Sequence, residues 1–169
     1  MDADALIKLT KCQAKEPVIA FAEVSIPIPV KAEAVDQAKA RGYPDAVAIE
    51  ENIRSGRLKV VDIGRVGDMP QAELFSTGGD RALFLAYNQA RWDAVVSDDG
   101  KLVRLLRALS VPVLTPATLL VLMARAKAAT VTQVKDLLAA LAPLVSGEEY
   151  ATARLTVEAL GTEEANHEG

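Results

Sequence analysis

The chain has 169 residues, a formal charge of −4 and 50% apolar residues, few of which are aromatic. This length suits one domain with a proper core and is short for two. The net negative charge argues against a surface that binds nucleic acid throughout, because such binding depends on clustered Lys and Arg. A local basic rim is compatible with the composition, and we expect no sequence-specific DNA binding.

The single cysteine and the single histidine further limit the kinds of catalytic and metal sites that the chain can form. Cys12 has no partner for an internal disulfide and fits a reducing interior, so we interpret it as a packing residue. His167 lies in a polar tail over residues 162–169, which rules out His-centred triads and His-rich zinc sites. The sequence contains neither a run of about 18 apolar residues nor a signal-peptide pattern, so we expect a cytoplasmic protein without a membrane span. Its chemistry must then depend on carboxylates.

Apolar periodicity predicts alternating helices and strands in the first half of the chain. A short helix is expected over residues 3–14, ending before Pro17, and the run over residues 23–27 has the pattern of a strand. Pro29 suits the first turn of a helix over residues 30–40. We then expect a helix over residues 45–55, a strand over residues 58–63, and a loop region over residues 64–79 with a short turn around residues 69–75.

The same alternation continues in the second half. Asp80 opens a helix, and a buried strand over residues 94–97 ends at Asp98. A leucine stripe over residues 102–109 predicts the next helix, and an edge-like strand over residues 111–114 follows it. We expect Thr115 to cap a further helix, an apolar stripe over residues 134–141, and a capping box of Ser146 with Glu149 before the last helix.

Strands that alternate with helices through short connections predict a three-layer α/β/α domain around a central parallel sheet, with extra C-terminal helices. No linker is evident, so we expect one domain over residues 1–161 followed by the polar tail. The apolar residues over 117–123 and 131–144 exceed what one small domain needs to bury. We therefore expect a homodimer through this surface.

Acidic residues stand at predicted strand ends and helix starts in four places along the chain. These are Asp2 with Asp4, Glu33, Asp80, and the pair Asp98-Asp99. Because the carboxyl ends of parallel strands meet along one crevice, these carboxylates can share a divalent metal. Each acid alone also has an ordinary explanation as a helix N-cap or a surface residue. The case for a metal site therefore depends on their combination.

The order of the motifs extends over nearly the whole chain. It runs from Asp2-Ala3-Asp4-Ala5-Leu6-Ile7 through Ile26-Pro27 and Glu33 to Gly79-Asp80 and Val95-Val96-Ser97-Asp98-Asp99. This order resembles the acidic signature of PIN-domain ribonucleases, and Arg41-Gly42-Tyr43-Pro44 is similar to one prokaryotic branch of PIN-like proteins. That family has a buried strand before its first Asp, whereas only Met1 precedes Asp2 here, so the first strand is expected to be truncated. Ala82 stands where the branch often carries a second acid.

The resemblance implies a carboxylate cluster that binds one or two Mg²⁺ or Mn²⁺ ions and cleaves RNA. It implies catalytic roles for Asp2, Glu33, Asp80 and Asp99, and metal ligation by Asp2, Asp80, Asp99 and Asp98, the last either as a ligand or as a support for Asp99. Asp4 and Ser97 fall at polar positions behind the ligands. Arg81, Lys101 and Arg104 flank the site and are candidates for contact with RNA phosphates, although such residues are more often solvated surface charges.

Two functional hypotheses follow, and a third possibility is less favoured. The first is a metal-dependent endoribonuclease, as in the toxin half of a toxin–antitoxin pair, with an antitoxin protein as partner. The second is a catalytically degraded PIN-like domain that binds protein or RNA, which the short N-terminus and Ala82 would explain. The order of the motifs argues against a response-receiver domain, because its acidic pair comes early in the chain, whereas here the pair comes late.

Overall fold

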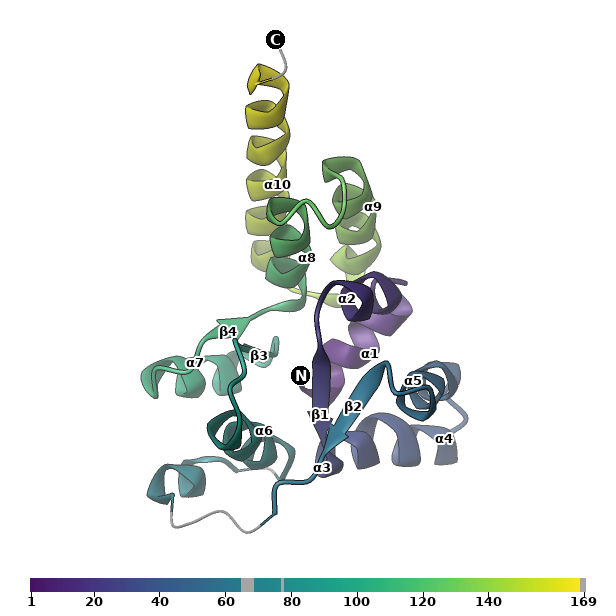
Figure 1. Ribbon diagram of the computed structural model, residues 1–169, viewed down its shortest axis with the longest axis vertical. Helices are drawn as coiled ribbons and strands as arrows, with labels where there is room; N and C mark the ends of the chain where they lie inside the picture. The colour runs from purple at the N-terminus through teal and green to yellow at the C-terminus, as the bar shows by residue number, and fades with distance from the viewer. Residues whose placement is uncertain (65–68, 77, 168–169) are drawn as a thin grey trace.

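The computed structural model describes residues 1–64, 69–76 and 78–167, with side chains as far as residue 163 (Figure 1). Part of the loop region expected over residues 64–79, and the side chain of His167, lie outside the described residues. The first half contains α1 (Ala3–Lys11), α2 (Lys15–Phe21), β1 (Val24–Pro27), α3 (Ile28–Lys31), the π-helical segment η1 (Ala32–Gln37), α4 (Ala38–Ala40), α5 (Pro44–Arg54) and β2 (Leu58–Val61). The second half contains the 3-10 turn η2 (Pro70–Leu74), α6 (Gly78–Gln89), β3 (Val95–Val96), α7 (Gly100–Ala108), β4 (Val113–Leu114), α8 (Pro116–Arg125), α9 (Val131–Leu141), the 3-10 turn η3 (Ala142–Leu144) and α10 (Gly147–His167).

The strands form two parallel pairs. β1 pairs with β2, with Val24 opposite Leu58, and β3 pairs with β4, with Val95 opposite Val113. The N-terminal residues lie between the pairs: the Met1 ammonium donates a 3.0 Å hydrogen bond to the carbonyl of Ser25 in β1. One residue later, the Asp2 amide donates a 3.0 Å hydrogen bond to the carbonyl of Val96 in β3. Met1 and Asp2 therefore stand in the central strand position of one continuous arrangement, in the order β2, β1, N-terminus, β3, β4.

Helices surround these strands. α3 and α6 pack against β1, α5 packs against β2, and α7 and α8 pack against β4. The core is aliphatic, with Leu6, Ile26, Ile49 and Leu106 among its largest fully buried side chains. The predicted α/β class with parallel strands is confirmed.

The sequence patterns do not predict the helix α2. Pro17 suggests the end of a helix, yet it lies in the first turn of α2, where a missing backbone N–H leaves no hydrogen bond unmade.

One of the two hydrogen bonds of the capping box predicted at Ser146 is present, because the Glu149 amide donates to Ser146 Oγ at 3.1 Å. The Glu149 carboxylate accepts a 3.1 Å hydrogen bond from the Ala117 amide, so it ties α10 to the first turn of α8.

The last three long helices pack on one another, and α10 projects away from the strands (Figure 1). The apolar residues of α8 that favoured a homodimer, including Leu119, Leu120 and Met123, are buried within the chain itself. The homodimer stays a prediction.

α10 continues to His167, so the helix includes most of the polar tail. Among the described residues, the helices are too short or too polar to span a bilayer.

Candidate functional site

Asp2 lies between the two strand pairs at the start of α1. Its Oδ1 accepts a 2.7 Å hydrogen bond from the Ala5 amide and so caps the helix. The residue is only 7% exposed. Burial raises the pKa of Asp2 to about 6; the Asp98 carboxylate acts in the same direction, and hydrogen bonds from Ser97 and Ala5 act against it. Asp2 is thus a buried carboxylate whose negative charge the protein stabilises only in part.

Asp98 follows β3 and faces the same region. Its side chain is 7% exposed, and its Oδ2 accepts a short hydrogen bond from the Lys8 ammonium. The other oxygen, Oδ1, is buried and has no hydrogen-bond partner. A buried carboxylate oxygen without a partner carries an uncompensated desolvation cost, so a cation or a donor at this position would be stabilised.

Lys8 is a further functional candidate, which the acidic motifs of the sequence do not indicate. Its ammonium binds Asp98 and also lies 3.4 Å from Oδ2 of Asp4, which is exposed at the start of α1. Burial lowers the pKa of Lys8, but the hydrogen bond to Asp98 and the charges of Asp98 and Asp4 outweigh burial and raise it. The spacing of Asp4 and Lys8 signals their ion pair in the sequence. The contact with Asp98 joins residues 90 positions apart, and no local pattern reveals it.

The side chains of Asp99 and Ser97 accept hydrogen bonds from backbone amides at and just before the start of α7. Asp99 is exposed, and its Oδ1 accepts hydrogen bonds from the amides of Lys101 at 2.7 Å and Leu102 at 2.8 Å. Ser97 is fully buried, and its Oγ accepts a 3.1 Å hydrogen bond from the Asp99 amide. Of the acidic pair, Asp98 is therefore the buried residue that pairs with Lys8, and Asp99 is the helix cap.

Glu33 and Asp80 form a second acidic location. Glu33 lies exposed in η1, and its Oε2 is 3.8 Å from the position that a Cβ on Gly79 would take. Asp80 lies half-buried in the first turn of α6, directly after Gly79. The structure thus brings the Glu33 carboxylate to the start of α6.

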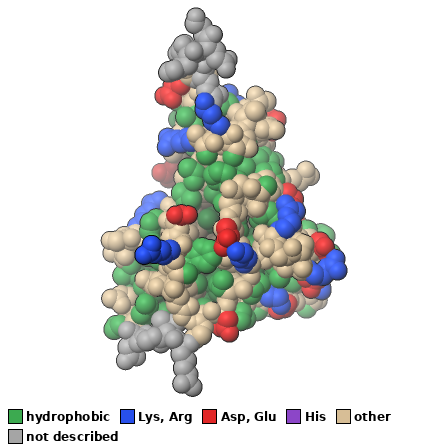
Figure 2. Space-filling model, in the orientation of Figure 1, with side chains coloured by type: hydrophobic (Ala, Val, Ile, Leu, Met, Phe, Trp, Pro, Cys, Tyr) green, Lys and Arg blue, Asp and Glu red, His purple; other side chains and the backbone are tan. Residues whose placement is uncertain are grey.

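The basic residues proposed for RNA contact lie on the surface. Arg81 is exposed and forms a 2.7 Å ion pair with Glu73, and Lys101 is exposed in the first turn of α7. Arg104 is also exposed, and its Nη1 lies 3.5 Å from the position that a Cβ on Gly100 would take, beside the N-terminus of α7. Figure 2 shows Lys and Arg side chains interspersed with Asp and Glu on the face in view, not gathered into one basic patch, as far as the described residues go.

The predicted acids therefore meet in two groups. Asp4 and Asp98 both pair with Lys8, and the charge of Asp98 acts on Asp2, while Glu33 lies beside Gly79 at the start of α6. Among the described residues, no three His, Cys, Asp or Glu side chains converge closely enough to hold a metal ion. Mg²⁺, however, is usually held by one or two carboxylates together with waters and substrate phosphates. The unpartnered oxygen of Asp98 beside Asp2 fits that requirement in both chemistry and charge.

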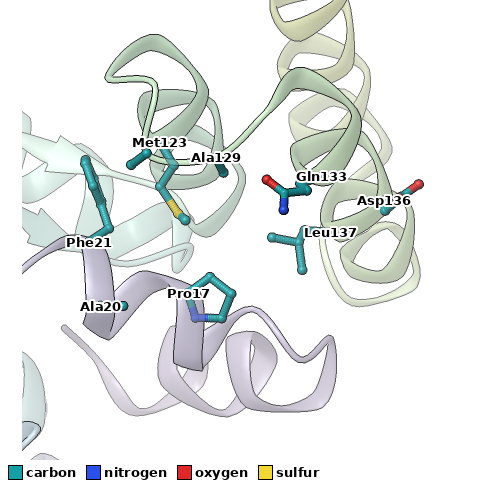
Figure 3. A pocket seen from close by; sticks show the side chains of 9 residues that line it. Pro17, Ala20, Phe21, Met123, Ala129, Gln133, Asp136 and Leu137 are labelled. Atoms are coloured by element: carbon teal, nitrogen blue, oxygen red, sulfur yellow. The ribbon is translucent and has the colours of Figure 1, made fainter.

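Two hollows lie near the strands and the C-terminal helices. A pocket of 450 Å³ lies between α2, α8 and α9, where Phe21, Met123 and Leu137 make it largely apolar (Figure 3). A cleft of 620 Å³ runs past Met1 and is lined by β1, β3 and α8. The predicted catalytic acids line neither hollow.

Comparison with known proteins identified a family for this chain. A family model described as a PIN domain matches residues 1–152, which is most of the chain. Neither the curated proteins nor the solved structures gave a match. The family match agrees with the parallel α/β fold and with the order of the acidic motifs. The chain belongs to the PIN-domain family.

Proposed function

We propose that this protein is a Mg²⁺- or Mn²⁺-dependent endoribonuclease of the PIN type. The observation that carries the proposal is the buried, unpartnered Oδ1 of Asp98, whose carboxylate acts through its charge on the buried carboxylate of Asp2. Two carboxylates of this kind suit a hard divalent cation, which supplies an activated water and neutralises charge on the scissile phosphate when bound. The nuclease-type fold of the family supports the same reaction class.

The residues around this pair have distinct roles in the proposal. Asp2 and Asp98 hold the cation, and Ser97 orients the connection between β3 and α7 through its bond to the Asp99 amide. Glu33 from η1 and Asp80 from the first turn of α6 would contribute further negative charge toward the substrate. Lys101 and Arg104 near the start of α7 contact the RNA phosphates, and Arg81 extends this surface.

The first experiment measures thermal stability with Mn²⁺ or EDTA, followed by cleavage of a labelled single-stranded RNA. Saturating Mn²⁺ should raise the melting temperature of the parent by about 5 °C, because a ligand that binds only the folded state stabilises it. Asp98→Asn and Asp2→Asn should lose both this rise and the Mn²⁺-dependent cleavage. Asp93→Asn is the matched control, because Asp93 is exposed in the connection before β3. A parent that neither gains stability with Mn²⁺ nor cuts RNA would refute the proposal.

A second candidate is a PIN-like domain that binds RNA or protein without cutting. Lys8 favours it, because a protein cation already neutralises Asp98, and so does Asp99, whose carboxylate caps α7. This candidate predicts RNA binding that does not respond to Mn²⁺ or EDTA. A role as a toxin with an antitoxin partner, and the homodimer, are further parts of the proposal. Growth arrest on expression, abolished by Asp98→Asn, would test the toxin role, and sedimentation would test the dimer.

A further inference from the structure

The Lys8 ammonium is a cation that the fold itself brings to the carboxylate of Asp98. It contacts Oδ2 of Asp98 and lies 3.4 Å from Oδ2 of Asp4, so it bridges two carboxylates from different parts of the chain. A divalent cation would then have the opposite oxygen of the same carboxylate, Oδ1 of Asp98, as its ligand.

The position of Lys8 is fixed by the fold. Asp2 starts α1, and Lys8 lies in the last turn of the same helix, on the face that it shares with Asp4. Its side chain is 22% exposed, so water only partly screens its charge from Asp98, whose side chain is 7% exposed. An ammonium that is held between two carboxylates in this way offsets their mutual repulsion without any ligand.

We propose that the Lys8 ammonium supplies a fixed positive charge at this site. This charge limits the site to one divalent ion, which Asp2 and Asp98 hold. The proposal depends on the proposed metal-dependent function and states how many ions that function uses. Lys8 is a positioning residue: it acts through the carboxylates, and it leaves only Oδ1 of Asp98 for the metal.

The test is a titration of Mn²⁺ by calorimetry, with bound Mn²⁺ counted by electron paramagnetic resonance. The parent should bind one Mn²⁺ per chain. Lys8→Met removes the charge and keeps much of the side-chain length, so it should bind a second Mn²⁺ or bind the first about tenfold more tightly. Lys8→Arg should resemble the parent because it keeps the charge. Lys11→Met is the matched control, because Lys11 is exposed on the same helix.

Three outcomes would overturn the proposal, and they differ in what they say about the function. One equivalent of Mn²⁺ with the same affinity in the parent and Lys8→Met would overturn the role of Lys8 and leave the metal-dependent function intact. No Mn²⁺ binding by either protein would overturn both. Failure of Lys8→Met to fold even in saturating Mn²⁺ would also overturn the role of Lys8, because a divalent ion should then supply the missing charge.

Discussion

At the scale of single residues, Asp2 has both a structural and a chemical role. Its carboxylate caps α1 through the Ala5 amide, and its burial raises its pKa to about 6. Asn is as good an N-cap as Asp, so the structural role survives Asp2→Asn while the charge is lost. The two roles can therefore be separated by one substitution.

The pH dependence of Asp2→Asn follows from the raised pKa. Folded Asp2 holds its proton more tightly than unfolded Asp2, so its stabilising contribution is complete below about pH 4 and is lost as the pH rises through about 6. Without metal, Asp2→Asn should gain about 3 kcal/mol of stability relative to the parent between these limits. Urea unfolding in EDTA from pH 4 to 7 measures this difference. Asp93→Asn should show no such trend, and a constant difference between Asp2→Asn and the parent would contradict the prediction.

At the scale of secondary-structure elements, α7 depends on the side chain that precedes it. Asp99 accepts hydrogen bonds from the amides of Lys101 and Leu102, which have no partners within the helix at its first turn. The helix carries Leu102 and Leu106 into the core, so fraying at its start also affects packing. This structural role of Asp99 is independent of any metal.

Asp99→Ala should lower the free energy of unfolding by about 1 kcal/mol, the usual cost of a lost N-cap. Asp99→Asn should cost much less, because the amide oxygen accepts the same hydrogen bonds. Urea denaturation of both variants in EDTA measures the difference. Equal destabilisation by Ala and Asn would mean that the charge of Asp99, not its capping oxygen, stabilises this region.

At the scale of the whole molecule, Met1 and Asp2 join the two strand pairs through hydrogen bonds to Ser25 in β1 and Val96 in β3. The Met1 ammonium lies where the amide of a central strand would donate to Ser25, and burial lowers the pKa of this ammonium to about 6. Beside it, the 620 Å³ cleft is lined by Val24 and Ser25 of β1 and by Val95 and Val96 of β3. The hydroxyl of Ser25 is buried there without a hydrogen-bond partner.

An extension of four or five Val and Ile residues fused to Met1 should therefore pair with β1 and β3 and fill the cleft. It would bury new apolar surface and replace the buried ammonium by a peptide group, so the melting temperature should rise by about 5 °C or more. Scanning calorimetry measures the change. A Gly-Ser extension of equal length is the control, and an equal effect of both extensions would show that the cleft does not accept a strand.

The sequence by itself determined most of the local structure, because its signals act within a few residues. Apolar periodicity located α1, α5 and α7, and the hydroxyl of Thr115 caps α8 as its position before Pro116 predicts. The order of the acidic motifs indicated the PIN-domain family, which the family match shows. The sequence did not predict α2, because Pro17 is compatible both with a position after a helix end and with the first turn of a helix.

Only the tertiary structure decided how the acids are used, because their environments depend on contacts between distant parts of the chain. Asp98 and Asp99 are adjacent and chemically identical, yet one faces Lys8 from α1 and the other caps α7. The raised pKa of Asp2 likewise results from burial between β1 and β3, which the chain order alone does not reveal. Burial and long-range charge pairing are properties of the packed molecule, and they distinguish a candidate metal ligand from an ordinary helix cap.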